Sequence, residues 1–249
     1  VIFVAVCLLT SPAEEPVAPP PETTAPTESA EIVAVKTVDE LLDSIASNRE
    51  IIMEPGNCVL SDAADYGKAG TEYYRWTEVA DGWALILTGV ENLTIRGGGL
   101  HVTTVETLPR YANVITLENC KNVIMEDFTA GHTRYQGECG GGVVRLQNSA
   151  DITMNRLGLF GCGIVGLDME LCSNVNANEC NIYECSSSAA WIRSSRYVTL
   201  SGCRIYSIGN EPYGGYTFLE VNDSADVLVE KSQLSDSTLN SLTVTFNSG

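Results

Sequence analysis

Residues 172–194 read CSNVNANECNIYECSSSAAWIRS, and residues 195–206 continue with SRYVTLSGCRIY. The second segment repeats the first, so that Val198 corresponds to Val175 and Cys203 to Cys180, at a spacing of 23 residues. Apolar and polar residues alternate in both segments, which is the pattern of a β-strand with one buried face. A unit of this length that recurs along a chain is typical of a solenoid.

The repeat extends in both directions from this stretch. Its first apolar positions are Leu93, Val123, Ile152, Val175, Val198 and Val227, at steps of 30, 29, 23, 23 and 29 residues. We interpret the longer steps as the same turn with six or seven inserted residues. A second alternating segment, such as VRLQN at residue 144 or WIRSS at residue 191, precedes each anchor. Because no long amphipathic helix separates these segments, the sequence predicts an all-β parallel β-helix of about 23-residue rungs.

Residues 36–60 predict the start of this solenoid. TVDELLDSIA places apolar residues at helical spacing, and EIIMEPGNCVL is typical of a strand, a Pro-Gly turn and a second strand. A short helix here would cap the open first rung. With this helix followed by Ile51-Ile52-Met53-Glu54-Pro55-Gly56, the chain resembles the right-handed parallel β-helix superfamily that includes pectate lyases and polygalacturonases. The resemblance covers residues 33–249 and implies a right-handed coil.

The chain has 14 Lys and Arg against 32 Asp and Glu, for a net charge of −18. This excess argues against nucleic-acid backbones and anionic membranes as partners. A hydrophobic share of 44% with 22 glycines predicts a folded domain with a substantial core.

The N-terminal residues predict export to a bacterial cell surface. Residues 1–10 are interpreted as the remainder of a signal segment, in which Val4-Ala5-Val6-Cys7 resembles a lipobox with Cys7 as the lipidated residue. Cleavage after Ala13 is the alternative. Residues 11–32 are rich in Pro, Glu and Thr and are expected to form a disordered tether, with the β-helix over residues 33–249. The membrane is then contacted only through the lipid anchor. We expect a monomer that is a fragment of a longer protein.

Stacked rungs place corresponding residues in columns. We expect Cys162, Cys180, Cys185 and Cys203 to be buried, reduced thiols in inward columns. A column of short polar side chains, interrupted by Tyr197, is expected to stabilise the bends, and its members are Asn92, Asn122, Asp151, Asn174 and Asp226. Two histidines and the absence of a CxxC pair argue against a zinc site.

The outward positions of the upstream strands form what we call the outer strip. Its members are Thr116, Glu118, Arg145, Gln147, Asp168, Glu170, Trp191, Arg193, Glu220 and Asn222. The inserted residues 104–112, 132–142 and 208–216 fall at the corner before these strands and would border the strip on both sides as a trough. His132, Arg134 and Tyr135 are expected on a loop over it. Such a trough suits a polysaccharide or cell-surface glycan, with Trp191 or Tyr135 stacking on a sugar ring.

Two reactions remain open: glycoside hydrolysis, which the pair of carboxylates supports, and β-elimination, which the resemblance to the superfamily's lyases implies. In glycoside hydrolysis, Asp168 and Glu170 would act as the acid and the base or nucleophile. In β-elimination from a uronic acid, Arg193 or Arg145 would act on the substrate, and Asp168 with Glu170 would hold Ca²⁺, the one cofactor considered. Arg145, Trp191, Glu220, Arg134 and Tyr135 are the expected substrate-binding residues, and His132 a further catalytic candidate.

The sequence departs from the superfamily in its catalytic motifs. The motif set of the polygalacturonases is absent, with only Gly131-His132 matching one element, and the pectate-lyase signatures are missing. A non-catalytic glycan-binding protein and an adhesive or structural stalk therefore remain alternatives to a carbohydrate-active enzyme.

Overall fold

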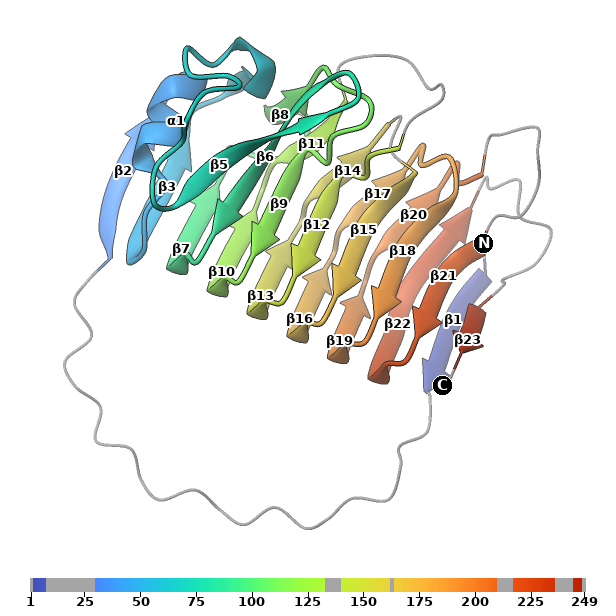
Figure 1. The fold of residues 1–249 in the computed structure, drawn as a ribbon. Coiled ribbons are helices and arrows are strands. Elements are labelled where there is room, and N and C mark those ends of the chain that lie inside the picture. Colours follow the sequence, from blue (N-terminus) through green and yellow to red (C-terminus); the bar gives the residue numbers. More distant parts are fainter. Residues whose placement is uncertain are drawn as a thin grey trace, which may run out of the picture.

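The fold is seen in a computed structural model, which describes residues 2–7, 30–132, 140–161, 164–209, 217–235 and 244–247. Strands in this part of the chain stack side by side as the rungs of a solenoid, with α1 at the end where β2 and β3 lie (Figure 1). They form two sheets, one of eight strands and one of 15. The sequence prediction of a right-handed parallel β-helix with a short N-terminal helix is confirmed.

The eight-stranded sheet carries the outer strip. In spatial order its strands are β23 (Val244–Asn247), β21 (Thr217–Asn222), β18 (Ser188–Arg193), β15 (Val165–Glu170), β12 (Val144–Gln147), β9 (Ile115–Glu118), β6 (Gly82–Thr88) and β5 (Tyr74–Val79). All neighbours are parallel except β5 and β6, which form an antiparallel hairpin. Each parallel strand belongs to a different rung.

The 15-stranded sheet supplies the other two sides of each rung. One side contains β2 (Glu31–Val35), β3 (Arg49–Met53), β7 (Glu91–Arg96), β10 (Lys121–Glu126), β13 (Ala150–Asn155), β16 (Ser173–Asn178) and β19 (Arg196–Ser201). The other contains β4 (Gly56–Val59), β8 (Thr103–Thr107), β11 (Thr129–His132), β14 (Gly158–Phe160), β17 (Asn181–Tyr183) and β20 (Arg204–Tyr206). The long strand β22 (Ala225–Ser235) pairs with both sides and joins them into one sheet.

The register confirms the repeat. Val123 pairs with both Leu93 and Ile152, and Val175 pairs with both Ile152 and Val198. These anchors are fully buried, as are their inward neighbours on the eight-stranded sheet such as Leu146. The sequence predicted at least two strands per rung. The third was not recognised because β14, β17 and β20 have only three residues each, too few to show an alternating pattern.

The helix α1 (Val38–Ser44) covers the first rung. Thr37 and Glu40 form a reciprocal capping box at its N-terminus. Leu41 and Leu42 are buried against the solenoid core. In the described part of the chain, no helix has the length and apolar character required to cross a lipid bilayer.

Residues at the very start of the chain form a strand, which the sequence analysis did not expect. β1 (Ile2–Cys7) pairs antiparallel with β22 at the opposite end of the solenoid from α1 (Figure 1). The outer edge of a last strand has free backbone N–H and C=O groups, so it accepts an additional strand. Residues 8–29, which contain most of the expected tether, lie outside the described residues.

The corners between rungs use left-handed backbone conformations. Asn92, Asn122, Asp151, Asn174 and Asp226 all have φ between 52° and 58°. Two neighbouring pairs in this column are hydrogen-bonded, with 2.8 Å from Asn122 Nδ2 to Asn92 Oδ1 and 2.7 Å from Asn174 Nδ2 to Asp151 Oδ1. The structural role expected for this column is confirmed, because Asn and Asp tolerate positive φ better than other side chains.

Leu171 occupies a second left-handed column, in which the two preceding rungs have Asn119 and Asn148 and the next rung has Ser194. Its φ is 56° and its side chain is 57% exposed. Replacing Leu171 by Asn should therefore stabilise the fold by about 0.5–1 kcal/mol, because the backbone strain is reduced. Denaturant unfolding measures this. Leu171→Ala is the control and should give no comparable gain. A loss of stability in Leu171→Asn would mean that the leucine makes a contact worth more than the strain.

Three of the four expected thiols are confirmed as buried and free, namely Cys180, Cys185 and Cys203, whereas Cys162 lies outside the described residues. Burial raises the pKa of Cys185 to about 12. The Cys203 thiol and burial together raise the pKa of Cys180 well above its usual value. Hydrogen bonding with the Cys180 thiol lowers the pKa of Cys203. Because all three side chains are buried, they should nevertheless resist iodoacetamide in the native protein and react after unfolding. Mass spectrometry of digested protein tests this, and rapid native labelling of the three would contradict it.

Candidate functional site

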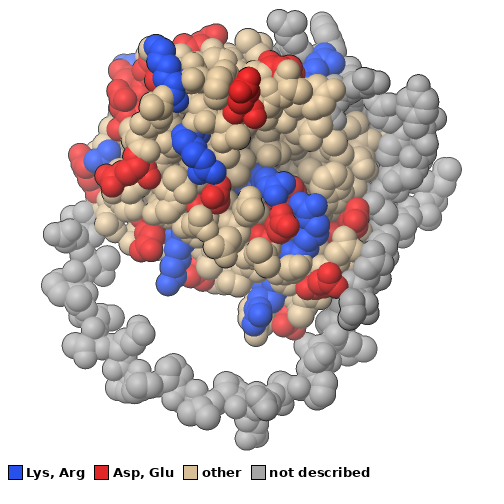
Figure 2. Space-filling model, in the orientation of Figure 1, with Lys and Arg blue, Asp and Glu red and all other residues tan. Residues whose placement is uncertain are grey.

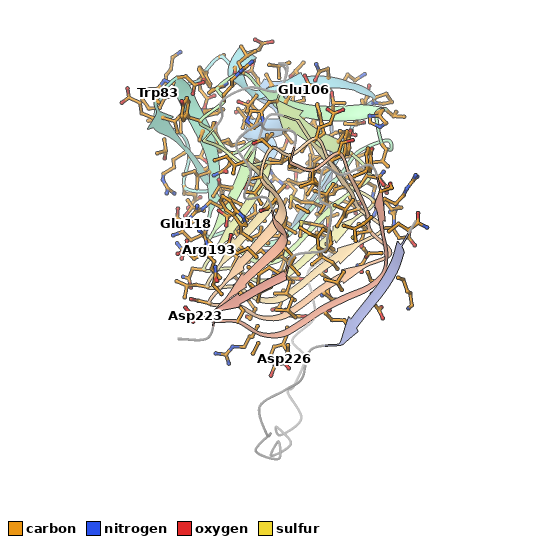
Figure 3. All side chains as sticks on the ribbon, turned by 90° about the vertical axis from the view of Figure 1, so that its right-hand side faces the viewer. Trp83, Glu106, Glu118, Arg193, Asp223 and Asp226 are labelled. Atoms are coloured by element: carbon orange, nitrogen blue, oxygen red, sulfur yellow. The ribbon has the colours of Figure 1, made fainter. Side chains whose placement is uncertain are left out.

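The outer strip lies on the outward face of three adjacent rungs. Asp168 of β15 is aligned with Arg145 of β12 on one side and with Trp191 of β18 on the other. Two residues further along the same strands, Glu170 is aligned with Arg193. Figure 3 shows Glu118 and Arg193 projecting from the same side of the solenoid. The sequence therefore placed these side chains on one face correctly.

Four of these side chains form one ion-pair network. Arg145 donates from Nη1 to Asp168 Oδ2 over 3.0 Å and from Nη2 to Glu170 Oε2 over 2.8 Å. Arg193 donates from Nη2 to Asp168 Oδ1 over 2.6 Å, and the same atom lies 3.9 Å from Glu170 Oε2. The Arg145 guanidinium thus bonds both carboxylates, and the Asp168 carboxylate bonds both guanidiniums. Basic and acidic side chains lie beside one another across the middle of this face (Figure 2).

Asp168 lies underneath the network. The residue is only 4% exposed, although its side chain points outward, because longer neighbouring side chains cover it. Burial raises the pKa of its carboxyl group, and the charges of Arg193 and Arg145 act in the opposite direction. Both of its oxygens accept hydrogen bonds from arginines. Asp168 is therefore placed to hold the two guanidiniums and has little surface with which to contact a ligand.

The exposed part of the network consists of the two arginines and Glu170. Their side chains are 28%, 34% and 37% exposed for Arg145, Arg193 and Glu170. The Arg193 guanidinium lies 5.8 Å from the ring centroid of Trp191, a cation–π contact. Within the described part of the chain, the buried Nε atom of Arg193 and the indole Nε1 of Trp191 have no hydrogen-bond partner. Buried donors of this kind are uncommon and cost stability.

The outer strip is bounded by an ion pair near β5 and by a hydrogen bond between two of its own side chains near β21. Near β5, Arg75 donates to the carboxylate of Glu118. The alternating segment before the anchor Leu93 predicted β6, whereas β5 runs antiparallel to it and has no counterpart in the other rungs, so Arg75 was missed. The alternation of YRWTEV, residues 74–79, was the available signal. Near β21, Glu220 accepts a 2.8 Å hydrogen bond from Asn222. Thr116 is buried.

The network does not fit Ca²⁺. Calcium takes six to eight oxygen ligands, most of them from carboxylates, carbonyls and water. Both oxygens of Asp168 and one oxygen of Glu170 instead face guanidiniums, whose positive charge would repel a cation. Among the described residues, no group of three or more His, Cys, Asp or Glu side chains could hold a metal ion. We assign no calcium site to Asp168 and Glu170.

The placement expected for His132 is corrected. It is the last residue of β11 rather than part of an overhanging loop, and only 2% of its surface is exposed. Its Nε2 lies 3.0 Å from the carbonyl oxygen of Ala112, and Nδ1 lies 3.4 Å from that of Gly161. Burial lowers the pKa of the imidazole below its usual value, against the effect of the two carbonyls. Arg134 and Tyr135, expected to bind substrate, lie outside the described residues.

Solved structures with the same arrangement of rungs identify the fold. An alginate lyase from Paenibacillus superposes with a TM-score of 0.57 at 11% identity, over 82% of this chain and 66% of that one. The chain has the pectate-lyase-like β-helix fold. A pectate lyase from Paenibacillus superposes with a TM-score of 0.51 at 11% identity, over 90% of this β-helix chain and 77% of the lyase. The catalytic domain of an α-1,3-glucanase superposes with a TM-score of 0.53 at 13% identity, over 88% of this chain and 41% of the glucanase domain.

At these identities the likeness establishes the fold alone, because one fold serves many functions. The β-helix chain spans 41% of the glucanase domain and 66% of the alginate lyase. No protein-family model matches its sequence, and no curated protein sequence matches it. An activity must therefore be argued from the outer strip itself.

Proposed function

We propose that this protein binds an acidic polysaccharide across the outer strip, with Arg145 and Arg193 against a sugar carboxylate. The net charge of −18 repels a polyanion, so this binding depends on the two local cations and should be stronger when salt screens the remaining charge. The observation that carries the proposal is the pair of guanidiniums held by one buried carboxylate. Asp168 fixes the two cations from below, while the more exposed Glu170 is the partner that a ligand carboxylate would replace. Arginine suits this exchange because its planar fork matches a carboxylate with two parallel hydrogen bonds.

The reaction that this arrangement suits is β-elimination. A base removes the proton from the carbon that bears the sugar carboxylate, a carbon–carbon double bond forms, and the bond to the leaving sugar oxygen breaks. Neutralising the carboxylate with two arginines would make that proton more acidic. Both arginines stay protonated, so neither can take up this proton. Glu170, once the sugar carboxylate has displaced it from Arg145, is our candidate for the carboxylate that receives the proton. The leaving oxygen takes a proton from water. The solved structures with this fold include an alginate lyase and a pectate lyase, which agrees with the proposal.

A second candidate is glycan binding without turnover. Its support is that all four ionisable groups of the network are engaged with one another, which leaves no free general base among them. Hydrolysis is less well supported, because a guanidinium occupies the space between the two carboxylates that would have to flank the scissile bond.

A panel of polyuronates and neutral polysaccharides tests these candidates. We expect absorbance from unsaturated uronates to appear with one or more polyuronates. The same absorbance should be lost in Arg145→Gln and retained in Arg156→Gln, an arginine that pairs with Asp127 on the other sheet. Binding without new absorbance would establish the second candidate. New reducing ends without absorbance would indicate hydrolysis, and neither binding nor turnover on any polymer would contradict both candidates.

We also propose that the protein is exported to a bacterial cell surface and anchored through Cys7, which rests on the sequence of residues 1–32. The measurement is the mass of the mature N-terminus from the native host. A diacylglycerol-modified Cys7 supports the anchor, and an unprocessed N-terminus in the cytosolic fraction contradicts export.

A further inference from the structure

A surface depression of about 520 Å³ lies where the β5–β6 hairpin meets the corner that precedes β9. The hairpin residues Asp81, Gly82 and Trp83 line one side of it, and Leu108, Pro109 and Arg110 line the other. Its volume is in the range of small-ligand sites, about 300–1,000 Å³. No residue of the outer strip belongs to it, so it is a separate concave feature of the molecule.

Hydrogen bonds hold the walls of this depression together. The carboxylate of Asp81 accepts the backbone N–H groups of Arg110 over 2.6 Å and of Tyr111 over 3.1 Å. On the other side, Ser61 Oγ accepts the backbone N–H of Leu108 over 3.0 Å. The corner is thereby tied both to the hairpin and to the 3₁₀ turn Leu60–Asp62. A ligand would therefore enter a preformed site and would not have to order it.

Two aromatic side chains, Trp83 and Tyr66, line the depression. The backbone N–H of Trp83 donates to Tyr66 Oη over 2.9 Å. Two glycines permit this packing: a Cβ on Gly67 would lie 2.6 Å from the indole Nε1 of Trp83, and a Cβ on Gly82 would lie 2.6 Å from Tyr66 Oη. Aromatic surface beside carboxylate, guanidinium and hydroxyl groups suits a sugar, which has an apolar ring face and a polar rim.

The depression and the network lie within reach of one oligosaccharide. Ile86 of β6 pairs with Thr116, which in turn pairs with Arg145. The backbone of Trp83 is three residues before Ile86, so it lies about 10 Å along the strand and about 10 Å across two strand spacings from the level of Arg145. The Trp83 side chain packs partly against the core and borders the depression at the end of the strand, so the sugar chain would have to pass over this end of β6 to reach it. Figure 3 shows Trp83 on the same side of the solenoid as Glu118 and Arg193. A linear chain of a few sugars covers this separation.

We propose that this depression is a second sugar-binding position, which holds a sugar unit of the same polysaccharide chain whose acidic unit lies at Arg145 and Arg193. This inference rests on the proposed function, because it assigns the two positions to one ligand. It predicts that affinity rises with oligosaccharide length once the chain extends from the network to Trp83.

The test is calorimetric titration with acidic oligosaccharides of two to eight units, using wild type, Trp83→Ala and Tyr197→Ala. We expect Trp83→Ala to lower the affinity for the long oligosaccharides by about tenfold and to leave that for the shortest ones unchanged. Tyr197 is an equally aromatic but exposed residue on the other sheet, so its replacement should change neither. Equal loss at every length, or no loss at any length, would overturn the inference.

A second variant covers the case in which Trp83→Ala does not fold. Leu108 is 39% exposed at the rim, so Leu108→Trp should fill the depression without removing the packing beneath it. The same length-dependent loss is expected, and unchanged affinity at all lengths would contradict the second position. Failure of the proposed function looks different: no oligosaccharide would then bind wild type, or Arg193→Gln would bind every length as wild type does.

Discussion

Replacing both Arg145 and Arg193 by methionine is expected to lower the free energy of unfolding by about 3–5 kcal/mol at pH 7. The reason is that the buried carboxylate of Asp168 would lose both of the cations that compensate its charge. Chemical denaturation measures the loss. The control is Arg156→Met, which removes an ion pair that is about half exposed at the arginine and should cost less than about 1 kcal/mol.

The loss in the double variant should depend on pH. Burial raises the pKa of Asp168 above the usual value of 3.8, and removing the arginines raises it further. A carboxyl group whose pKa is higher in the folded than in the unfolded protein lowers the free energy of unfolding as pH rises. The loss is absent below the unfolded pKa and complete above the folded pKa. The deficit should therefore shrink as pH falls toward 3.8, and Asp168→Asn in the double variant should restore stability at pH 7. A double variant as stable as Arg156→Met at pH 7 would show that Asp168 is not a buried charge.

Phe128→Ala is expected to lower the free energy of unfolding by a similar amount, about 3–5 kcal/mol. Phe128 is fully buried inside the solenoid between β10 and β11, where no neighbouring rung can collapse into the cavity. Urea denaturation gives the value. The matched variant is Phe160→Ala, because Phe160 lies on the outside of β14, stacked 5.8 Å from Tyr183. Equal losses in the two variants would contradict the assignment of inward and outward positions.

The rungs could be predicted because they repeat one physical requirement. Each rung must bury an anchor such as Val175 and must turn sharply next to it, where Asn174 takes a left-handed conformation. Each requirement therefore selects a residue type that recurs in the sequence at a fixed spacing, an apolar residue for the anchor and Asn or Asp for the turn. The antiparallel strand β5 and the strand β1 occur once each, so no period indicated them, whereas β6 fell within the repeat and was predicted.

The candidate site was predicted in its position and not in its chemistry. Alternation along β15 shows that Asp168 points outward. It does not show that the neighbouring arginines fold over the carboxylate and bury it, because that depends on side-chain lengths across three rungs. For the same reason the pair Asp168 and Glu170 suggested a calcium site. His132 was misplaced because the boundary between β11 and the corner after it is not marked by a turn residue.

Arg145 and Arg193 are proposed to contact the sugar acid of a polysaccharide. This contact is tested by the affinity of wild type, Arg193→Gln and Arg156→Gln for the oligosaccharide that the panel identifies, at a temperature where all three proteins are folded. We predict that Arg193→Gln weakens binding by about tenfold or more, whereas Arg156→Gln does not change it. Equal affinities for Arg193→Gln and wild type would contradict the claim.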